Sequence, residues 1–210
     1  VGCSNAYQPN GNLDGLDLSM FAGEWGILIR LRGVDDLRND NEVEVGFYGN
    51  ADPIALSPTR QPLPHATYAT DQDPRFRATT RGRIVDGVLT TEPVDVRFRY
   101  VVNGMYLERP LEKARVRFEL TQENLDGILG GYTSVEEMYD MSYGFRTGKD
   151  ESGQLASERL RIGSATGASI VLGHTCNGAY HALQQLADGD RDPKTGQCRS
   201  LSTQYRIRAI

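Results

Sequence analysis

The stretch that decides the fold is residues 94–120, which read VDVRFRYVVNGMYLERPLEKARVRFEL. Over 94–100 and again over 115–120, apolar residues alternate with charged ones. A period of two indicates strands that have one buried face and one exposed face. Between the two runs, Asn103-Gly104 supplies the residues with positive φ that a two-residue hairpin turn requires. The stretch therefore predicts two antiparallel strands joined by a tight turn.

The same signals recur on both sides of this stretch. Apolar and polar residues alternate over 25–32, 42–47 and 205–210, and Asp86-Gly87 and Asp126-Gly127 are further hairpin dipeptides. Three consecutive hairpins across 75–132 predict an antiparallel meander. Such a sheet buries its apolar face by closing into a barrel or by packing as a sandwich.

Helical signals are few. Ser134-Val135-Glu136-Glu137 is a capping-box pattern that predicts a short helix through about Ser142, and 175–187 predicts a second helix that ends before Gly189. The predicted fold is therefore mostly β, a barrel or sandwich with two short helices. We expect 1–12 to be a polar spacer and 13–210 to form a single β-rich domain. The Pro-rich segment 50–74 is expected to be an extended strap laid across the sheet.

Composition excludes several classes of protein. The 210 residues are 39% hydrophobic and 24% charged, which is too apolar for a disordered chain. No apolar run reaches the roughly 18 residues that a membrane-spanning helix needs. A net charge of −5 argues against a nucleic-acid-binding protein, because neutralising many phosphates requires an excess of cations.

Arginines are arranged in a repeated pattern. Arg-x-Arg occurs at 30/32, 75/77, 81/83, 97/99, 115/117, 159/161 and 206/208. In a strand, both members of each pair lie on one side of the sheet, so neighbouring pairs predict a broad cationic face. The residues predicted to form this face are Arg75, Arg77, Arg81, Arg83, Arg97, Arg99, Arg115 and Arg117.

Two interpretations of that face remain open. Like charges on facing strands repel each other, so either carboxylates of the same chain or an outside anion must relieve them. In the first case, cross-strand Arg–Glu pairs neutralise the face internally. In the second, the chain is an extracytoplasmic binding or structural module, an accessory subunit of a cell-envelope or extracellular assembly, whose partner is a protein subunit or an anionic glycan.

The three cysteines bear on the compartment. Cys3, which follows Val1-Gly2, resembles the lipidated cysteine of a bacterial lipoprotein. Two alternatives stay open, a lipid anchor at Cys3 and a plain secreted or periplasmic chain, and both predict a periplasmic, outer-membrane or secreted location. Cys176 and Cys198 bracket a polar loop and are expected to form a disulfide in an oxidising compartment.

Two candidate metal sites lie near the same loop. Asp188, Asp190 and Asp192 alternate in a turn, a pattern that predicts a partial calcium site. His174, His181 and Asp188 recur at a spacing of seven residues, which on a helix would place them on one face. They give the alternative hypothesis, a metal-dependent hydrolase. The chain lacks a Gly-x-Ser-x-Gly motif and a phosphate-binding loop, so no catalytic residues are predicted.

Overall fold

The computed structural model describes residues 26–59, 61–102, 105–145, 159–160 and 176–210. These residues fall into two compact units. One, the sheet unit, consists of the described residues up to Tyr132 together with Thr203–Ile210; the other, the helical unit, consists of those within Thr133–Ser202. The prediction that 13–210 forms one domain stays a prediction, and residues 1–12 lie outside the described ranges.

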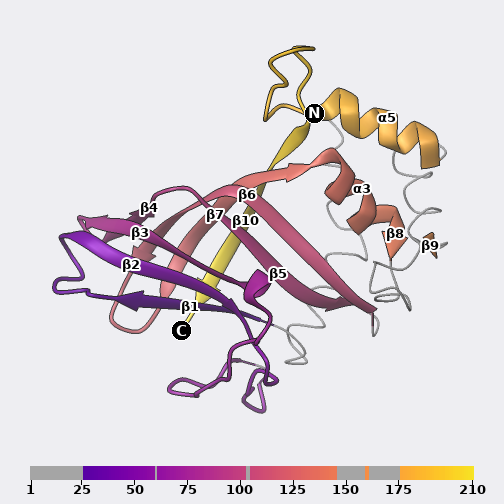
Figure 1. Ribbon diagram of the computed structural model, residues 1–210. Coiled ribbons are helices and arrows are strands. Elements are labelled where there is room, and N and C mark those ends of the chain that lie inside the picture. Colours follow the sequence, from indigo (N-terminus) through magenta and orange to yellow (C-terminus); the bar gives the residue numbers. More distant parts are fainter. Residues whose placement is uncertain (1–25, 60, 103–104, 146–158, 161–175) are drawn as a thin grey trace. The chain divides into compact units, whose positions relative to one another are not determined.

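The chain is mostly antiparallel β, with a curled half-barrel sheet, which confirms the predicted fold class (Figure 1). The sheet has the order β1-β2-β3-β4-β6-β7-β10, and β5 also pairs with β6. Its strands are β1 (Ile27–Arg32), β2 (Asp40–Gly49), β3 (Arg77–Val85), β4 (Val88–Thr91), β5 (Val94–Val102), β6 (Met105–Leu120), β7 (Leu125–Ser134) and β10 (Ser200–Ala209). A short 3-10 helix, η1 (Pro74–Phe76), precedes β3.

Two short strands share the long strand β6. In β4, Thr90 lies opposite Arg117 of β6, whereas in β5, Phe98 lies opposite Arg109. The two strands are separated at Glu92–Pro93, where proline lacks the N–H that a continuous ladder would use. One side of β6 is therefore covered by two strands in succession.

A bulge divides β6 into two halves. Opposite β7, Glu112 pairs with Tyr132 but the next pair is Arg115 with Gly130, so β6 has one extra residue here. Lys113 has φ 51°, and its backbone N–H donates to the Asp95 carboxylate at 2.8 Å. Because of the extra residue, the core-facing positions change from the odd-numbered Leu111 to the even-numbered Ala114, both fully buried.

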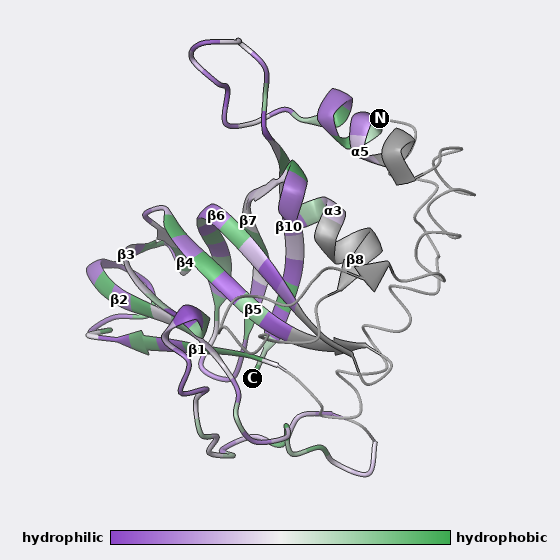
Figure 2. Ribbon diagram, turned by 45° about the vertical axis from the view of Figure 1, so that its right-hand side comes forward, coloured by the Kyte–Doolittle hydropathy of each residue, from purple (hydrophilic) through white to green (hydrophobic). Residues whose placement is uncertain are grey.

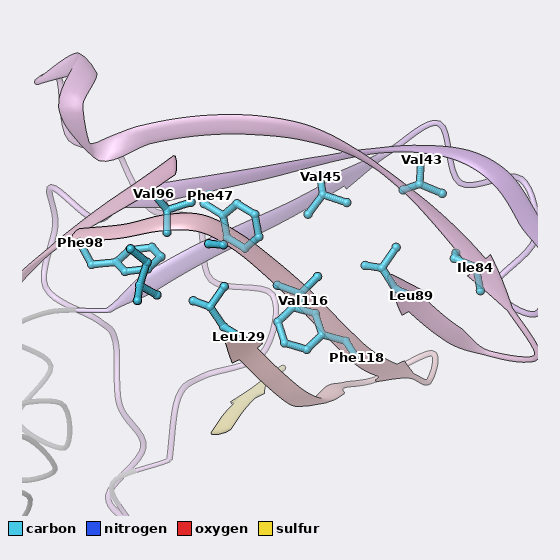
Figure 3. Close-up of a cluster of buried hydrophobic side chains, with 12 residues drawn as sticks. Val43, Val45, Phe47, Ile84, Leu89, Val96, Phe98, Val116, Phe118 and Leu129 are labelled. Atoms are coloured by element: carbon cyan, nitrogen blue, oxygen red, sulfur yellow. The ribbon is translucent and has the colours of Figure 1, made fainter. Parts of the chain in front are cut away.

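The hydrophobic core lies on one face of this sheet. Its fully buried side chains converge from β2, β3, β4, β6 and β7 (Figure 3), and they include Val43, Val45, Phe47, Ile84, Leu89, Phe118 and Leu129. Val43, Val45, Phe47 and Phe118 come from alternating runs, and hydrophilic and hydrophobic bands succeed each other along the strands (Figure 2). Removing this much apolar surface from water is the main stabilising contribution.

The structure confirms one predicted hairpin turn and corrects another. Asp86 and Gly87 have φ of 50° and 78° and join β3 to β4, as expected. Residues 103–104 lie outside the described ranges, although Val102 pairs with Met105 on either side of them.

The prediction of a turn at Asp126-Gly127 is wrong. Both residues lie within β7, and the chain reverses at 121–124, where the Thr121 hydroxyl accepts from the backbone N–H of Asn124 at 3.0 Å. Gly127 serves close packing instead, because a Cβ there would collide with the backbone of Arg117.

The helical unit contains the two predicted helices, α3 (Val135–Tyr143) and α5 (Cys176–Leu186). The Ser134 hydroxyl caps α3 by accepting from the backbone N–H of Glu137 at 3.1 Å. The short strands β8 (Gly144–Phe145) and β9 (Arg159–Leu160) pair with each other. Within the described ranges, no helix is long and apolar enough to cross a membrane.

Candidate functional site: an arginine groove

The structure divides the eight predicted surface arginines into two groups. The first group lies on β3 and β6, on either side of β4; we call this site the arginine groove, and its cations are Arg81, Arg83, Arg115 and Arg117. The second group surrounds carboxylates near the start of β3; we call it the arginine–carboxylate cluster, and its cations are Arg75, Arg77, Arg97 and Arg99.

Strand register sets the geometry of the groove. Thr90 of β4 lies directly opposite Arg83 on one side and opposite Arg117 on the other. One row further along, the Glu92 N–H donates to the Arg81 carbonyl at 2.8 Å, where β4 gives way to Pro93. Given the usual strand spacing and rise, the four arginine Cα atoms lie near the corners of a rectangle of about 10 by 7 Å.

The groove has a volume of about 1000 Å³ and a largely uncharged floor. Thr90, Thr91, Glu92 and Pro93 line it between the arginine-bearing strands β3 and β6, and Ile128 and Gly130 line it on β7, beyond Arg117 and Arg115. Ile128 is 45% exposed, so its side chain offers apolar surface to the groove. The floor therefore combines hydroxyl groups with an accessible apolar surface.

Carboxylates neutralise the groove only in part. Arg81 lies 3.9 Å from Glu42, and their side chains are 76% and 77% exposed. Arg117 lies 3.9 Å from Glu119 and is similarly exposed. Exposed pairs of this kind contribute about 0–1 kcal/mol. In the described part of the chain, Arg83 and Arg115 make no ion pair.

The arginine–carboxylate cluster is internally paired. Glu108 accepts from Arg75 at 3.0 Å and from Arg97 at 2.8 Å, and Arg99 lies 3.1 Å from Asp71. A hydrogen bond with Asp73, at 2.8 Å, raises the pKa of Arg75 above its usual value. These side chains already have the partners that an outside anion would supply.

Arg75 and Arg77 do not share a strand face as predicted. Arg75 lies in η1, where Asp73 caps the turn by accepting from the Arg75 N–H at 2.9 Å. The Arg77 Nε donates to the Asp71 carbonyl at 2.7 Å. The Pro-rich segment thus supplies hydrogen-bond acceptors to both side chains. The prediction that 75–77 belongs to a strand did not include these contacts.

Two further Arg-x-Arg pairs each share one carboxylate. Arg30 and Arg32 lie 3.4 and 3.8 Å from Glu44. Arg206 and Arg208 lie 3.1 and 2.6 Å from Asp126. Hydrogen bonds from Arg206 and then Arg208 lower the pKa of the Asp126 carboxyl below its usual range. In both pairs, a carboxylate of the same chain lies close to both arginines and offsets their charge.

The predicted calcium ligands are engaged separately. Asp188 accepts from the Ser202 hydroxyl at 2.6 Å, a bond that lowers the pKa of that carboxyl. Asp192 accepts from the Lys194 N–H at 2.7 Å, and Arg199 lies 3.8 Å from Asp190. Over the described residues, no group of three histidine, cysteine, aspartate or glutamate side chains is positioned to hold a metal ion.

The histidine site of the alternative hypothesis is only partly described. His174 lies outside the described residues. His181 is exposed on α5, and its Nδ1 lies 3.2 Å from the Gln184 amide oxygen. The Asp188 carboxylate accepts hydrogen bonds from the backbone N–H and the hydroxyl of Ser202. The structure therefore adds nothing that favours a hydrolase.

The predicted disulfide is not seen. Cys198 has a free thiol, and the side chain of Cys176 lies outside the described residues, as does Cys3. The loop that the disulfide was expected to hold is closed by the backbone instead, because the Gly189 N–H donates to Ser200 at 2.9 Å and the Arg199 N–H donates to Gly189 at 3.0 Å.

Sequence reasoning missed the residues between the arginines. The two-residue turn at Asp86-Gly87 is enough to place Thr90 opposite Arg83, so this half of the Arg83–Thr90–Arg117 row could be predicted from the sequence. The other half, Thr90 opposite Arg117, follows from the pairing of β4 with β6, which skips β5. No local signal indicates that pairing.

No family model matches this chain, and no curated protein or solved structure matches it either. The groove is therefore the feature of this chain that points to a function.

Proposed function

We propose that this chain is a binding module whose arginine groove holds an anionic partner, as an accessory subunit of a cell-envelope or extracellular assembly. The observation that carries the proposal is the row in which Arg83 and Arg117 flank the uncharged Thr90. Of the four cations of the groove, Arg83 and Arg115 make no ion pair with described residues.

The groove has more cations than carboxylates. Arg83 and Arg117 lie about two strand spacings apart with Thr90 between them, so they do not oppose each other directly. Glu42 and Glu119 form weak, exposed pairs with two of the four guanidinium groups, and Glu92, which also lines the groove, forms no ion pair within the described residues. A bound carboxylate or other oxyanion would supply partners to Arg83 and Arg115, and the guanidinium fork suits such groups because it donates two parallel hydrogen bonds.

The groove is also a local exception in an acidic protein. The chain has a net charge of −5, yet this one face concentrates cations. A patch of opposite sign steers an anionic partner to one place on the surface and speeds association. The proposed location outside the cytoplasm depends on the sequence around Cys3 alone.

Binding to immobilised polyanions tests the proposal. We expect the protein to be retained by polygalacturonate or by poly-L-glutamate at low salt and released as salt rises. In Arg83→Ser/Arg115→Ser, affinity should fall about tenfold or more, because each lost bidentate contact is a charge-assisted one.

The matched control is Arg206→Ser/Arg208→Ser, which removes the same charge from a site where Asp126 already neutralises both arginines. This control should keep the affinity of the parent protein. An equal loss in both variants would mean that net charge alone governs retention. That result, or no retention by either polyanion, contradicts the proposal.

A further inference from the structure

Hydrogen-bond acceptors separate the cations of the groove. Glu92 follows Thr91 at the end of β4, between the strands that contain Arg81 and Arg115, and Thr90 lies between Arg83 and Arg117. Both intervening residues line the groove, as does Glu42. A ligand that fits must therefore offer hydroxyl or amide donors in alternation with its anionic groups.

This alternation disfavours ligands that have anionic groups only. A phosphodiester backbone or a run of acidic side chains would place negative charge against Glu92 and Glu42 as well as against the arginines. A polysaccharide of acidic sugars has carboxylates and hydroxyl groups on the same rings. Its carboxylates can accept from arginine while its hydroxyl groups donate to Glu92, Glu42 and Thr90.

The floor of the groove offers surface on which a sugar ring can lie. Ile128 and Pro93 are exposed, and the C–H faces of a ring can pack on their apolar side chains. Gly130 has no side chain to rise above the floor, and the nearest atom to its Cβ position is the Thr203 carbonyl oxygen at 3.8 Å.

We infer that the ligand of the arginine groove is a linear polysaccharide with carboxylate groups, an inference that rests on the function proposed above. Its chain crosses β4, with carboxylates on Arg83 and Arg117 about two strand spacings, or roughly 10 Å, apart. The sugar ring between them lies over Thr90, and the chain continues over Ile128 and Gly130.

Calorimetric titration with fragments of polygalacturonate and with poly-L-glutamate, matched in carboxylate number, tests this assignment. We expect polygalacturonate to bind about tenfold more tightly than poly-L-glutamate at the same salt concentration. Dextran sulfate, which has sulfates in place of carboxylates, should bind more weakly than polygalacturonate.

Two variants give changes that a nonspecific polyanion site would not show. In Glu92→Ala, loss of the acceptor should weaken polygalacturonate binding several-fold, while loss of the repulsion should strengthen poly-L-glutamate binding. In Ile128→Ser, polygalacturonate binding should weaken and poly-L-glutamate binding should stay unchanged. Circular dichroism and urea denaturation check that both variants fold.

The outcomes separate this inference from the proposed function. If both carboxylate polymers bind equally, and Arg83→Ser/Arg115→Ser abolishes both, the groove binds anions but the polysaccharide assignment is overturned. The polysaccharide assignment is also overturned if dextran sulfate binds more tightly than polygalacturonate. It is overturned as well if Glu92→Ala binds both polygalacturonate and poly-L-glutamate more strongly than the parent protein does. If neither polymer binds, the proposed function fails together with the inference.

Discussion

The arginine groove and the arginine–carboxylate cluster both contain Arg-x-Arg pairs, but they differ in what lies opposite each arginine. In the cluster, Arg99 lies directly opposite Glu108. In the groove, Arg83 lies opposite Thr90. The same motif thus gives a paired network in one region and an open cationic surface in the other. Strand register contributes to this difference without deciding it alone, because Arg81 of the groove lies opposite Glu44, and Glu44 is paired with Arg30 and Arg32 instead.

The Pro-rich segment adds to the difference. Its Asp71 and Asp73 supply carboxylates to Arg99 and Arg75, and the Asp71 N–H donates to the Gly49 carbonyl at 2.8 Å, which holds the segment against the end of β2. Within the described residues, no comparable segment lines the groove. An arginine pair is therefore neutralised where a connection lies close enough to contribute acidic side chains.

The largest expected effect comes from removing the shared carboxylate of the cluster. In Glu108→Gln, the half-buried Arg97 and the neighbouring Arg75 lose a charged hydrogen-bond partner, and we expect the free energy of unfolding to fall by about 2 kcal/mol. Glu92→Gln in the groove, where no carboxylate–arginine hydrogen bond is lost, should change it by less than about 0.5 kcal/mol. Urea denaturation of both variants measures the difference. Equal losses would show that the two regions do not differ energetically.

An intermediate effect is expected from placing a carboxylate in the open row. Thr90→Glu adds an acidic side chain between Arg83 and Arg117, so the groove should become internally paired like the cluster. We expect affinity for polygalacturonate to fall about tenfold, or about 1.4 kcal/mol.

Thr90→Gln is the control for this change, because it has the same length without the charge. Its affinity should stay close to that of the parent protein. If Thr90→Gln binds as weakly as Thr90→Glu, the loss is steric and does not arise from neutralisation of the arginines.

The smallest expected effect concerns acid pH. Because Arg206 and Arg208 hold the pKa of Asp126 below its ordinary value, their contribution to stability is complete above about pH 4. It is lost as the pH falls through the lowered pKa, since the folded chain must then protonate this carboxylate. Arg206→Ser/Arg208→Ser should therefore unfold at slightly lower urea than the parent at pH 6, and the difference should disappear at strongly acid pH. A difference that grows as the pH falls would contradict this assignment.

Local patterns predicted the elements of this fold, while contacts between distant residues decided the site. Alternation located the strands with their buried Val43, Val45 and Phe118, because a period of two between apolar and polar residues can be read directly from the sequence. The Asp86-Gly87 turn was predictable for the same reason. Asp126-Gly127 has the same local signal but lies within β7, because Gly127 is required where β7 crosses Phe118 closely.

The candidate site was predicted only in part. Arg81, Arg83, Arg115 and Arg117 were expected together and do line one groove. The other arginines were assigned to the same face because spacing alone does not show that Glu108 lies opposite Arg99, or that η1 contains Arg75. Those facts depend on register and on the path of a long connection, which local spacing does not determine.

The bulge at Lys113 constrains how this protein can change over evolutionary time. Deleting one residue between Leu111 and Ala114 would invert the second half of β6, so that Arg115 and Arg117 would meet the core and Val116 and Phe118 would meet water. Insertions or deletions in the reversal at 121–124 leave the faces of β6 unchanged, because this reversal follows the strand. We therefore expect descendants of this gene that keep the groove to vary in length at that reversal, but never at the bulge.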